Sequence, residues 1–468
     1  MSSHKHEQKF SKQRTYNAAL HLLNTIFEGN VYPDILLGKF FQQEKFTSEE
    51  KKAIVELVYE IIRHRGKIDH IIGNTSRAVV SKLDLNILNI LRLCAYEATS
   101  ANTSSCAVIN NAIALSSKEG MFKGFIKRTM EAIIRNRDNL VFPDIERDPI
   151  KYISIFHSHP VWIVEKWAAE LKDIDEVEDL CKASNLPPPL MIRVNPLKTT
   201  IPDLQKALLK DGYSTSTTGF SPYGLVVDKK ENIFRTNAFR NGDFEVQDEG
   251  SQLITLLAGA RQGECVIDAC AGNGGKTLFL SGRMQNTGIV IASDNNPSKF
   301  RNLRRRADRA GAFNIKTATI DELLQYTGRA DRVFIDAPCS GMGVFRRNPD
   351  SKWRLRKQDI LELSKKQKEI LKSYSSFVKP GGWLVYATCT ISREENEDVV
   401  WDFLEKNECF HLIPPSEVDP GIFGRFASQD GFFRSMPHIH GTDGFFGAVM
   451  MRRKIELTNS CSDMKSVT

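Results

Sequence analysis

The chain has 468 residues, of which 41% are hydrophobic and 26% are charged, and its formal net charge is +7. This composition is typical of a soluble globular protein, and no apolar run reaches the roughly 18 residues that a membrane span needs. The length is too great for one hydrophobic core and predicts two or three domains. The N-terminus is polar and basic without an apolar segment behind it, so we expect no signal peptide and a cytoplasmic location.

Residues 1–145 are predicted to form an all-helical domain. Apolar residues recur at i, i+3, i+4 and i+7 from Tyr16 to Phe27, which is the pattern of a helix with one buried face. Thr47 or Ser48 is in position to cap the next helix, because two glutamates follow it. No strand pattern interrupts this region.

Residues 146–243 are predicted to form a connector and a small α+β module. Prolines mark the connector. A helix follows it, and Pro187-Pro188-Pro189 marks the end of that helix. A strand is expected at Leu190–Val194, and a helix from about Ile201 to Asp211.

Residues 244–455 have an α/β pattern, and the polar residues 456–468 are predicted to be a disordered tail. Helical segments separate four short apolar runs. These runs are Cys265–Asp268, Ile289–Ala292, Arg332–Ile335 and Trp383–Tyr386. The alternation predicts a Rossmann-like, mostly parallel sheet with helices on both faces.

A glycine-rich turn follows the first of these strands, and its spacing fits neither a P-loop nor the dinucleotide motif. Glycines let the backbone approach a ligand, and the next helix offers free N–H groups. Asp294 ends the second strand, where it can accept hydrogen bonds from a ribose, and Asp321 follows the third, where it can face an adenine. The candidate cofactor ligands are Cys270, Ala271, Gly272, Asn273, Gly274, Gly275, Lys276, Asp294, Asp321 and Asp336. The alternative is a tight turn without a ligand.

Two of the nine cysteines lie just beyond the ends of predicted strands, Cys339 and Cys389. None of the nine forms CxxC or has zinc spacing, so neither a disulfide framework nor a metal site is expected. Ligands bind beyond the carboxyl ends of parallel strands, so both cysteines should lie near the glycine-rich turn. A thiolate that adds to carbon 6 of a cytosine makes carbon 5 nucleophilic, and Asp336 can stabilise the adduct. The alternative is that both cysteines belong to the core.

Three segments of the chain carry motifs of one family. They are ACAGNGGKT from Ala269, DAPCSGMGVFRRNPDSKW from Asp336 and YATCTISREENEDVV from Tyr386. Together they resemble the Sun (RsmB/NOP-type) family of RNA cytosine-5 methyltransferases. The resemblance implies S-adenosylmethionine as cofactor, Cys389 as nucleophile and Cys339 as the cysteine that assists release. Asn273 departs from the family's usual proline, and we still expect the loop to bind cofactor.

The N-terminal region has a weaker resemblance. Ala107–Ala112 and Lys123–Arg135 resemble the NusB-like RNA-binding domain of the family's bacterial 16S rRNA members. This resemblance implies 16S rRNA or an assembling small subunit as the substrate. We find no sequence sign of oligomerisation and expect a monomer.

Basic residues follow Cys339 closely and are predicted to contact RNA phosphates. The candidates for RNA binding are Arg193, Arg346, Arg347 and Lys352, with Arg354 and Asn195 as further contacts and Phe345 and Trp353 for base stacking. The alternative is a solvated, charged helix face. A paired cytosine would have to be flipped out of its helix.

Two other functions remain open from the sequence. A DNA cytosine-5 methyltransferase would use the proline-cysteine residue, here Cys339, as nucleophile. A non-catalytic ribosome-assembly factor would keep the fold without the reaction, although the presence of both cysteines argues against it.

Overall fold

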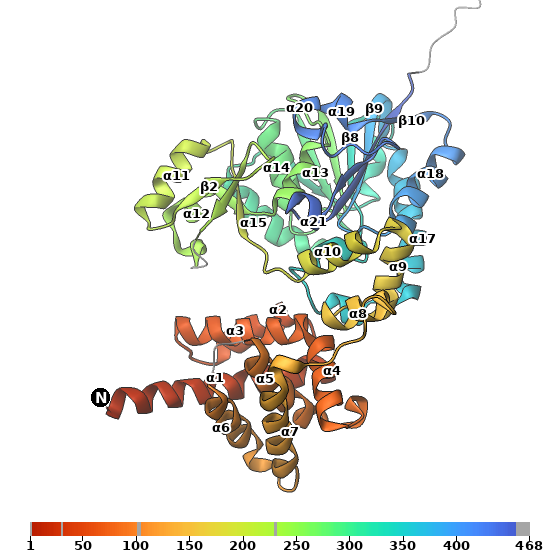
Figure 1. The fold of residues 1–468 in the computed structure, drawn as a ribbon. Helices are drawn as coiled ribbons and strands as arrows, with labels where there is room; N and C mark the ends of the chain where they lie inside the picture. Colours follow the sequence, from red (N-terminus) through yellow and green to blue (C-terminus); the bar gives the residue numbers. More distant parts are fainter. Residues whose placement is uncertain (1, 30, 101–103, 229–231, 455–468) are drawn as a thin grey trace, which may run out of the picture. The chain divides into compact units, whose positions relative to one another are not determined.

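The chain folds into two compact units (Figure 1). The first comprises Met1–Leu186 and Phe345–Leu355, and the second comprises Pro187–Val344 and Arg356–Thr468. The computed structural model describes residues 2–29, 31–100, 104–228 and 232–454. The predicted tail, 456–468, lies outside these ranges. Within them, no helix has the length and apolar character needed to cross a membrane.

The first unit is entirely helical, as predicted for the N-terminal domain. Its α-helices are α1 (Ser2–Gly29), α2 (Pro33–Gln43), α3 (Ser48–Arg63), α4 (Arg65–Ser76), α5 (Leu85–Ser100), α6 (Ser105–Leu115), α7 (Phe122–Asn136), α8 (Pro149–Phe156), α9 (Val161–Leu171), α10 (Ile174–Ser184) and α16 (Ser351–Arg354). Its 3-10 turns are η1 (Val80–Lys82), η2 (Ser116–Lys118) and η3 (Arg137–Asn139).

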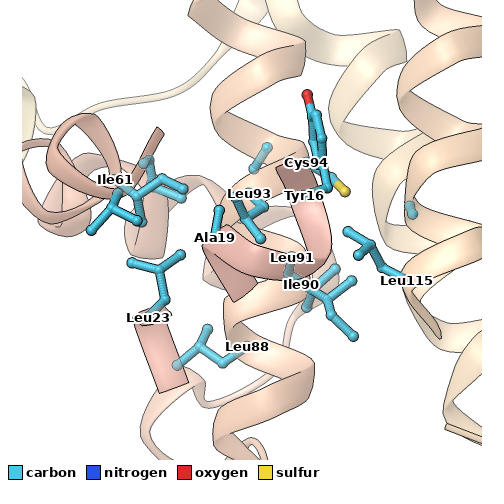
Figure 2. Close-up of a cluster of buried hydrophobic side chains, with 14 of the residues drawn as sticks. Tyr16, Ala19, Leu23, Ile61, Leu88, Ile90, Leu91, Leu93, Cys94 and Leu115 are labelled. Carbon is cyan, nitrogen blue, oxygen red and sulfur yellow. The ribbon is translucent and has the colours of Figure 1, made fainter. Parts of the chain in front are cut away.

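The core of this unit forms between α1, α3, α5 and their neighbours (Figure 2). Tyr16, Ala19 and Leu23 follow one another at helical spacing and are buried on one face of α1. Leu88 and Leu91 belong to the same cluster from α5. The predicted apolar stripe of the first helix is therefore its packing face.

A capping box starts α3. Oγ1 of Thr47 accepts a hydrogen bond from the amide of Glu50 at 3.2 Å, and the carboxylate of Glu50 accepts one from the amide of Thr47 at 2.9 Å. Of the two expected capping residues, Thr47 is the N-cap, and Ser48 is the first residue of the helix.

The second unit begins with a small antiparallel sheet in the order β2-β3-β1-β4. Its elements are β1 (Leu190–Val194), α11 (Ile201–Lys210), β2 (Thr215–Thr217), β3 (Gly224–Val227), η4 (Ile233–Arg235), α12 (Asn237–Asn241) and β4 (Phe244–Val246). Ile192, Leu204 and Phe244 are buried in its core, so this part has the predicted α+β character.

A larger sheet follows in the order β10-β12-β9-β8-β5-β6-β7, with β11 paired to β12. Its strands are β5 (Cys265–Ala269), β6 (Ile289–Ser293), β7 (Ile315–Ala318), β8 (Ala330–Asp336), β9 (Val378–Thr388), β10 (Phe410–Ile413), β11 (Phe433–Ser435) and β12 (Phe445–Arg452). Strands β5 to β9 pair in parallel, and β10, β11 and β12 add antiparallel pairs. The predicted mostly parallel, Rossmann-like sheet is confirmed.

Helices cover both faces of this sheet. The helices and turns of this region are α13 (Glu249–Leu256), α14 (Gly275–Arg283), η5 (Pro297–Lys299), α15 (Phe300–Ala310), η6 (Glu322–Tyr326), η7 (Met342–Val344), α17 (Lys357–Ser375), η8 (Arg393–Glu395), α18 (Glu397–Lys406), α19 (Pro415–Val418), α20 (Pro420–Phe423) and α21 (Pro437–His440). Successive strand residues point to opposite faces. Val266 therefore packs with α13 and α14, whereas Ile267 packs with α17 and α18.

The capping box gives a first testable prediction. Thr47→Ala removes the acceptor for the Glu50 amide and should lower the free energy of unfolding by about 1 kcal/mol. Ser48→Ala is the matched control, and its effect should stay within about 0.5 kcal/mol because Ser48 is not the cap. Urea unfolding measures both, and equal losses would contradict the assignment of Thr47 as N-cap.

Candidate active site

The glycine-rich loop joins β5 to α14 at the carboxyl edge of the large sheet. Gly274 has φ +81°, and a Cβ atom there would lie 2.6 Å from Cγ of Leu303, so both conformation and space require glycine. Gly272 has φ +57°, but a Cβ there would have only the Cys270 carbonyl oxygen near it, at 3.9 Å. Cys270 itself has φ +61°, a strained conformation that often occurs at functional sites.

Asp294, directly after β6, holds this loop. Its carboxylate accepts hydrogen bonds from the amides of Gly272 and Asn296, both at 2.8 Å, and pairs with Lys299 at 3.2 Å. The amide of Ala271 donates to the carbonyl group of the residue before Asp294. The structure thus brings Asp294 and the loop together.

Other loop residues are tied to the surrounding helix and module. The side chain of Asn273 accepts a hydrogen bond from Asn302 at 3.2 Å, and its carbonyl oxygen accepts one from Arg306 at 2.6 Å. The carbonyl oxygen of Gly275 accepts one from Arg193 at 2.8 Å. Asparagine in place of the family's proline therefore adds a side-chain contact with α15.

Two aspartates near the loop differ in their environment. Asp321 is exposed at the start of η6, and no hydrogen bond among the described residues joins its carboxyl group to the loop. Asp268 is fully buried at the end of β5, and its Oδ2 accepts a hydrogen bond from Thr277 at 2.6 Å. Burial raises the pKa of Asp268 to about 7. Its Oδ1 has no hydrogen-bond partner within the described residues. Asp268 was not among the residues predicted for the site, although it directly precedes the glycine-rich turn in the sequence.

Lys276 and Asp336 form an ion pair between the loop and the end of β8. Nζ of Lys276 lies 2.6 Å from Oδ2 of Asp336, with the side chains 16% and 30% exposed. Burial acts to lower the pKa of Lys276, but the charges of Asp336 and, more weakly, of Cys389 outweigh it, so this pKa is raised. A partly exposed carboxylate and a cation therefore lie near the candidate nucleophile.

The two candidate catalytic cysteines lie side by side. Their Sγ atoms are 3.4 Å apart, and both thiols are free. The pKa of Cys339 is raised well above its usual range, first by its hydrogen bond with Cys389 and then by burial and by the charges of Cys389 and Glu395. The sequence analysis placed both at this edge, and the structure brings them together.

A buried carboxylate, which the sequence analysis missed, connects the two cysteine loops. Glu395 accepts hydrogen bonds from the amide of Ser340 at 2.8 Å, from its hydroxyl at 2.5 Å and from Gln367 at 3.0 Å. The hydroxyl of Thr390 donates to it at 3.4 Å. The sequence REENE offered several acidic residues, and only the fold distinguishes the buried one.

The basic stretch after Cys339 is largely internal to the helical unit, which corrects the predicted RNA contacts. Lys352 is fully buried, and its Nζ donates to Asn185 and to the carbonyl oxygen of Arg63, both at 2.9 Å. Arg346 is 5% exposed and Phe345 1% exposed. The predicted surface roles of these three residues are wrong because their side chains are enclosed by protein.

The other residues predicted to contact RNA lie in different environments. Trp353, predicted to stack on bases, instead donates its indole N–H to the carbonyl oxygen of Ile62 at 2.8 Å. Arg354 pairs with Asp350 at 3.1 Å. Arg347 is only half-buried, and its contact with RNA stays a prediction.

Arg193 and Asn195 also have internal roles. Arg193 is 2% exposed, and its guanidinium lies over the ring of Phe279 at 4.4 Å. Burial lowers its pKa to about 9. Asn195, 5% exposed, donates to the carbonyl oxygens of Gly242 and Ala310. The RNA contacts predicted for this pair are wrong, because both side chains are enclosed where they join the small sheet to α14 and α15.

Comparison with known proteins adds independent evidence. Family models match in succession: the NusB family over residues 14–139, the ferredoxin-like domain of RsmF/B-like methyltransferases over 159–233, and 16S rRNA methyltransferase RsmB/F over 254–451.

Two curated relatives and one solved structure are similar along much of the chain. A probable ribosomal RNA small subunit methyltransferase B of Bacillus subtilis is 29% identical over 95% of this chain and 99% of its own. A human 28S rRNA (cytosine(4447)-C(5))-methyltransferase is 33% identical over 63% of this chain and 38% of its own. The crystal structure of PH0851 superposes with a TM-score of 0.75 at 25% identity, over 93% of this chain and 98% of the other.

The parallel sheet, the glycine-rich loop after β5 and the acidic residue after β6 define the class, a Rossmann-like methyltransferase that uses S-adenosylmethionine. The family matches are consistent with this class along the chain. Over most of its length the chain is similar to the RsmB/F family of RNA methyltransferases.

The residues of the loop fit this cofactor. The open space beside Gly272 leaves room for a ligand against the backbone. The unpartnered Oδ1 of Asp268 is an acceptor of the kind that suits a cationic amino group. Asp294 is anchored at the position where a carboxylate can accept hydrogen bonds from ribose hydroxyls.

The two glycines should differ in their tolerance of a side chain. Gly274→Ala should lower the free energy of unfolding by about 3 kcal/mol or more, because a positive φ and a close contact with Leu303 act together. Gly272→Ala, the matched control, should cost about 1 kcal/mol because only the backbone conformation is strained. Chemical unfolding measures both, and similar costs would contradict the packing argument.

Asp268 should make stability depend on pH. Because its pKa is about 7 in the folded chain and ordinarily 3.8, the unfolded state releases this proton first, and folding stability falls as pH rises from about 4 to 7. Asp268→Asn abolishes this titration and should reduce the loss of stability between pH 5 and pH 8 by on the order of 2–4 kcal/mol.

The control for this experiment is Asp308→Asn, at an exposed position on α15. Thermal and urea unfolding at both pH values supply the measurement. An unchanged pH dependence in Asp268→Asn would show that the buried carboxyl group does not titrate in this window.

Proposed function

We propose that this protein methylates carbon 5 of a cytosine in 16S rRNA through a covalent adduct with Cys389, acting as a monomer. The observation that carries the proposal is the pair of free thiols at 3.4 Å beside the glycine-rich loop. The names of the relatives support its two parts. The human relative's name gives carbon 5 of cytosine, and the Bacillus subtilis relative's name gives the small ribosomal subunit.

The enzyme must supply a nucleophile to activate the ring, because carbon 5 of cytosine is by itself a poor nucleophile toward a methyl group. Addition of the Cys389 thiolate to carbon 6 turns the ring into an enamine-like species that is nucleophilic at carbon 5. S-adenosylmethionine supplies the methyl group as an electrophile. Afterwards a base removes the carbon-5 proton, the bond between sulfur and carbon 6 breaks, and the ring becomes aromatic again.

The surrounding residues suit distinct roles in this sequence. Asp336, 30% exposed and oriented by Lys276, is available to stabilise the adduct at N3 of the cytosine. The ammonium of Lys276 lies close enough to Cys389 for the two groups to interact electrostatically. Cys339 keeps its proton to a higher pH, so it suits assistance of the release step rather than the first attack.

Cofactor contacts are assigned along the loop. We expect the backbone from Cys270 to Gly275 to approach the amino-acid part of the cofactor. Asp294 is proposed for the ribose hydroxyls and Asp321 for the adenine amino group. Asp321 is exposed and accessible for such a contact.

Adduct trapping with 16S rRNA tests the division of labour. Cys339→Ala should accumulate a covalent enzyme–RNA adduct on a denaturing gel, because release is impaired, whereas Cys389→Ala should form none. Both variants should bind S-adenosylmethionine by calorimetry. The reverse pattern would make Cys339 the nucleophile, as in DNA cytosine-5 methyltransferases. Methylation detected by bisulfite sequencing in another RNA but not in 16S rRNA would overturn the substrate.

A further inference from the structure

The side chain of Glu395 hydrogen-bonds to both cysteine loops, which also meet directly where the Ser340 and Thr390 hydroxyls lie 2.8 Å apart. Oε1 accepts from the amide of Ser340, next to Cys339, and Oε2 accepts from the hydroxyl of Thr390, next to Cys389. Gln367 of α17 completes the contact, since it donates both to Glu395 and to the carbonyl oxygen of Pro338. The residues on one side of each cysteine are therefore fixed to one carboxylate.

The next residue supports Cys389 from both sides. The side chain of Asn396 donates to the carbonyl oxygen of Thr390 at 3.0 Å and accepts from the hydroxyl of Thr388 at 2.6 Å. Tyr386 in turn donates its hydroxyl to the carbonyl oxygen of Glu395 at 2.6 Å. The turn that carries Glu395 is thus held against β9, and a shift of its carboxylate would move the loops with it.

The state of this carboxylate follows from its partners. Glu395 is fully buried, and burial raises its pKa in spite of the hydrogen bonds that it accepts. Two hydroxyls, one amide and one side-chain amide all donate to it. A carboxylate is an acceptor only, so this set of donors suits the ionised form.

The negative charge of Glu395 acts on Cys339. The pKa of Cys339 is raised first by its hydrogen bond with Cys389, and the charge of Glu395 adds to that rise. Removal of the charge at Glu395 should therefore ease ionisation of Cys339.

We propose that Glu395 is the positioning residue of this active site, which fixes the separation of the two cysteine loops and places its negative charge where it acts on Cys339. The inference rests on the proposed function for the roles of the two thiols. The hydrogen bonds and the charge of Glu395 do not depend on which RNA is the substrate.

The experiment compares Glu395→Gln, Glu395→Ala and the matched control Glu394→Gln. Glu394 belongs to the same turn, and its carboxylate accepts a hydrogen bond from the hydroxyl of Ser392. Two measurements are made on the full chain. The first is the rate of covalent adduct formation with 16S rRNA, with each variant combined with Cys339→Ala so that the adduct accumulates. The second, with Cys339 present, is the pH at which iodoacetamide alkylates each cysteine to one half, followed by mass spectrometry.

Loss of the carboxylate should impair chemistry without affecting the cofactor site. Glu395→Ala should slow adduct formation by about 100-fold, because misplacement of reacting groups by about an ångström has effects of that size. Glu395→Gln keeps one of the two acceptor oxygens, so its adduct formation should slow less. In Glu395→Gln, the half-alkylation pH of Cys339 should fall, because a negative charge near the thiol is removed, and Glu394→Gln should match the unaltered protein.

Three outcomes separate this inference from others. An unchanged adduct rate in Glu395→Ala, or an unmoved half-alkylation pH of Cys339 in Glu395→Gln, would overturn it. If Glu395→Ala also loses S-adenosylmethionine binding, this variant is misfolded. The half-alkylation pH of Cys339 in Glu395→Gln then decides whether the inference holds. If Cys339→Ala with Glu395 intact forms no adduct with RNA, the proposed function fails, whereas the alkylation shift still tests the charge effect.

Discussion

The parallel pairing of β8 with β9 is the constraint on which the active site depends. Asp336 lies opposite Ala387 in the register, so the chain leaves both strands at the same edge of the sheet. Cys339 and Cys389 are 50 residues apart in the sequence, yet their sulfur atoms are 3.4 Å apart. Strand β5 pairs in parallel with the other side of β8, which brings the glycine-rich loop to that edge as well. One sheet therefore places the cofactor loop and both thiols.

Hydrogen-bond satisfaction distinguishes the residues that hold the site from those available to a ligand. Both carboxylate oxygens of Glu395 have donors, and the amide of Asn396 is used on both sides. Buried polar atoms without a partner are rare because each costs free energy. Oδ1 of Asp268 is such an atom, and it lies just before the glycine-rich loop. A satisfied scaffold around the cysteines thus adjoins an unsatisfied acceptor at the cofactor loop.

Basic residues in this chain show that charge does not determine location. Lys352 and Arg346 follow the proline-cysteine motif in the sequence, yet they belong to the interior of the helical unit. Arg193 is enclosed in the same way by the small sheet and α14. By contrast, Arg301, Arg304 and Arg305 are exposed on α15. Long basic side chains can either reach solvent or donate to buried oxygens, and only the fold selects between these outcomes.

The sequence by itself determined the all-helical N-terminal region and the parallel sheet, because both follow from local periodicity. It also determined that Cys339 and Cys389 lie at strand ends, because parallel strands share one carboxyl edge. It also indicated the cofactor loop, because glycine spacing is local. Only the tertiary structure decided that Glu395 connects the cysteine loops, that Asp268 has an unpartnered oxygen and that Lys352 is internal. Burial and hydrogen-bond partners depend on residues distant in the chain, and these contacts exist only once the chain has folded.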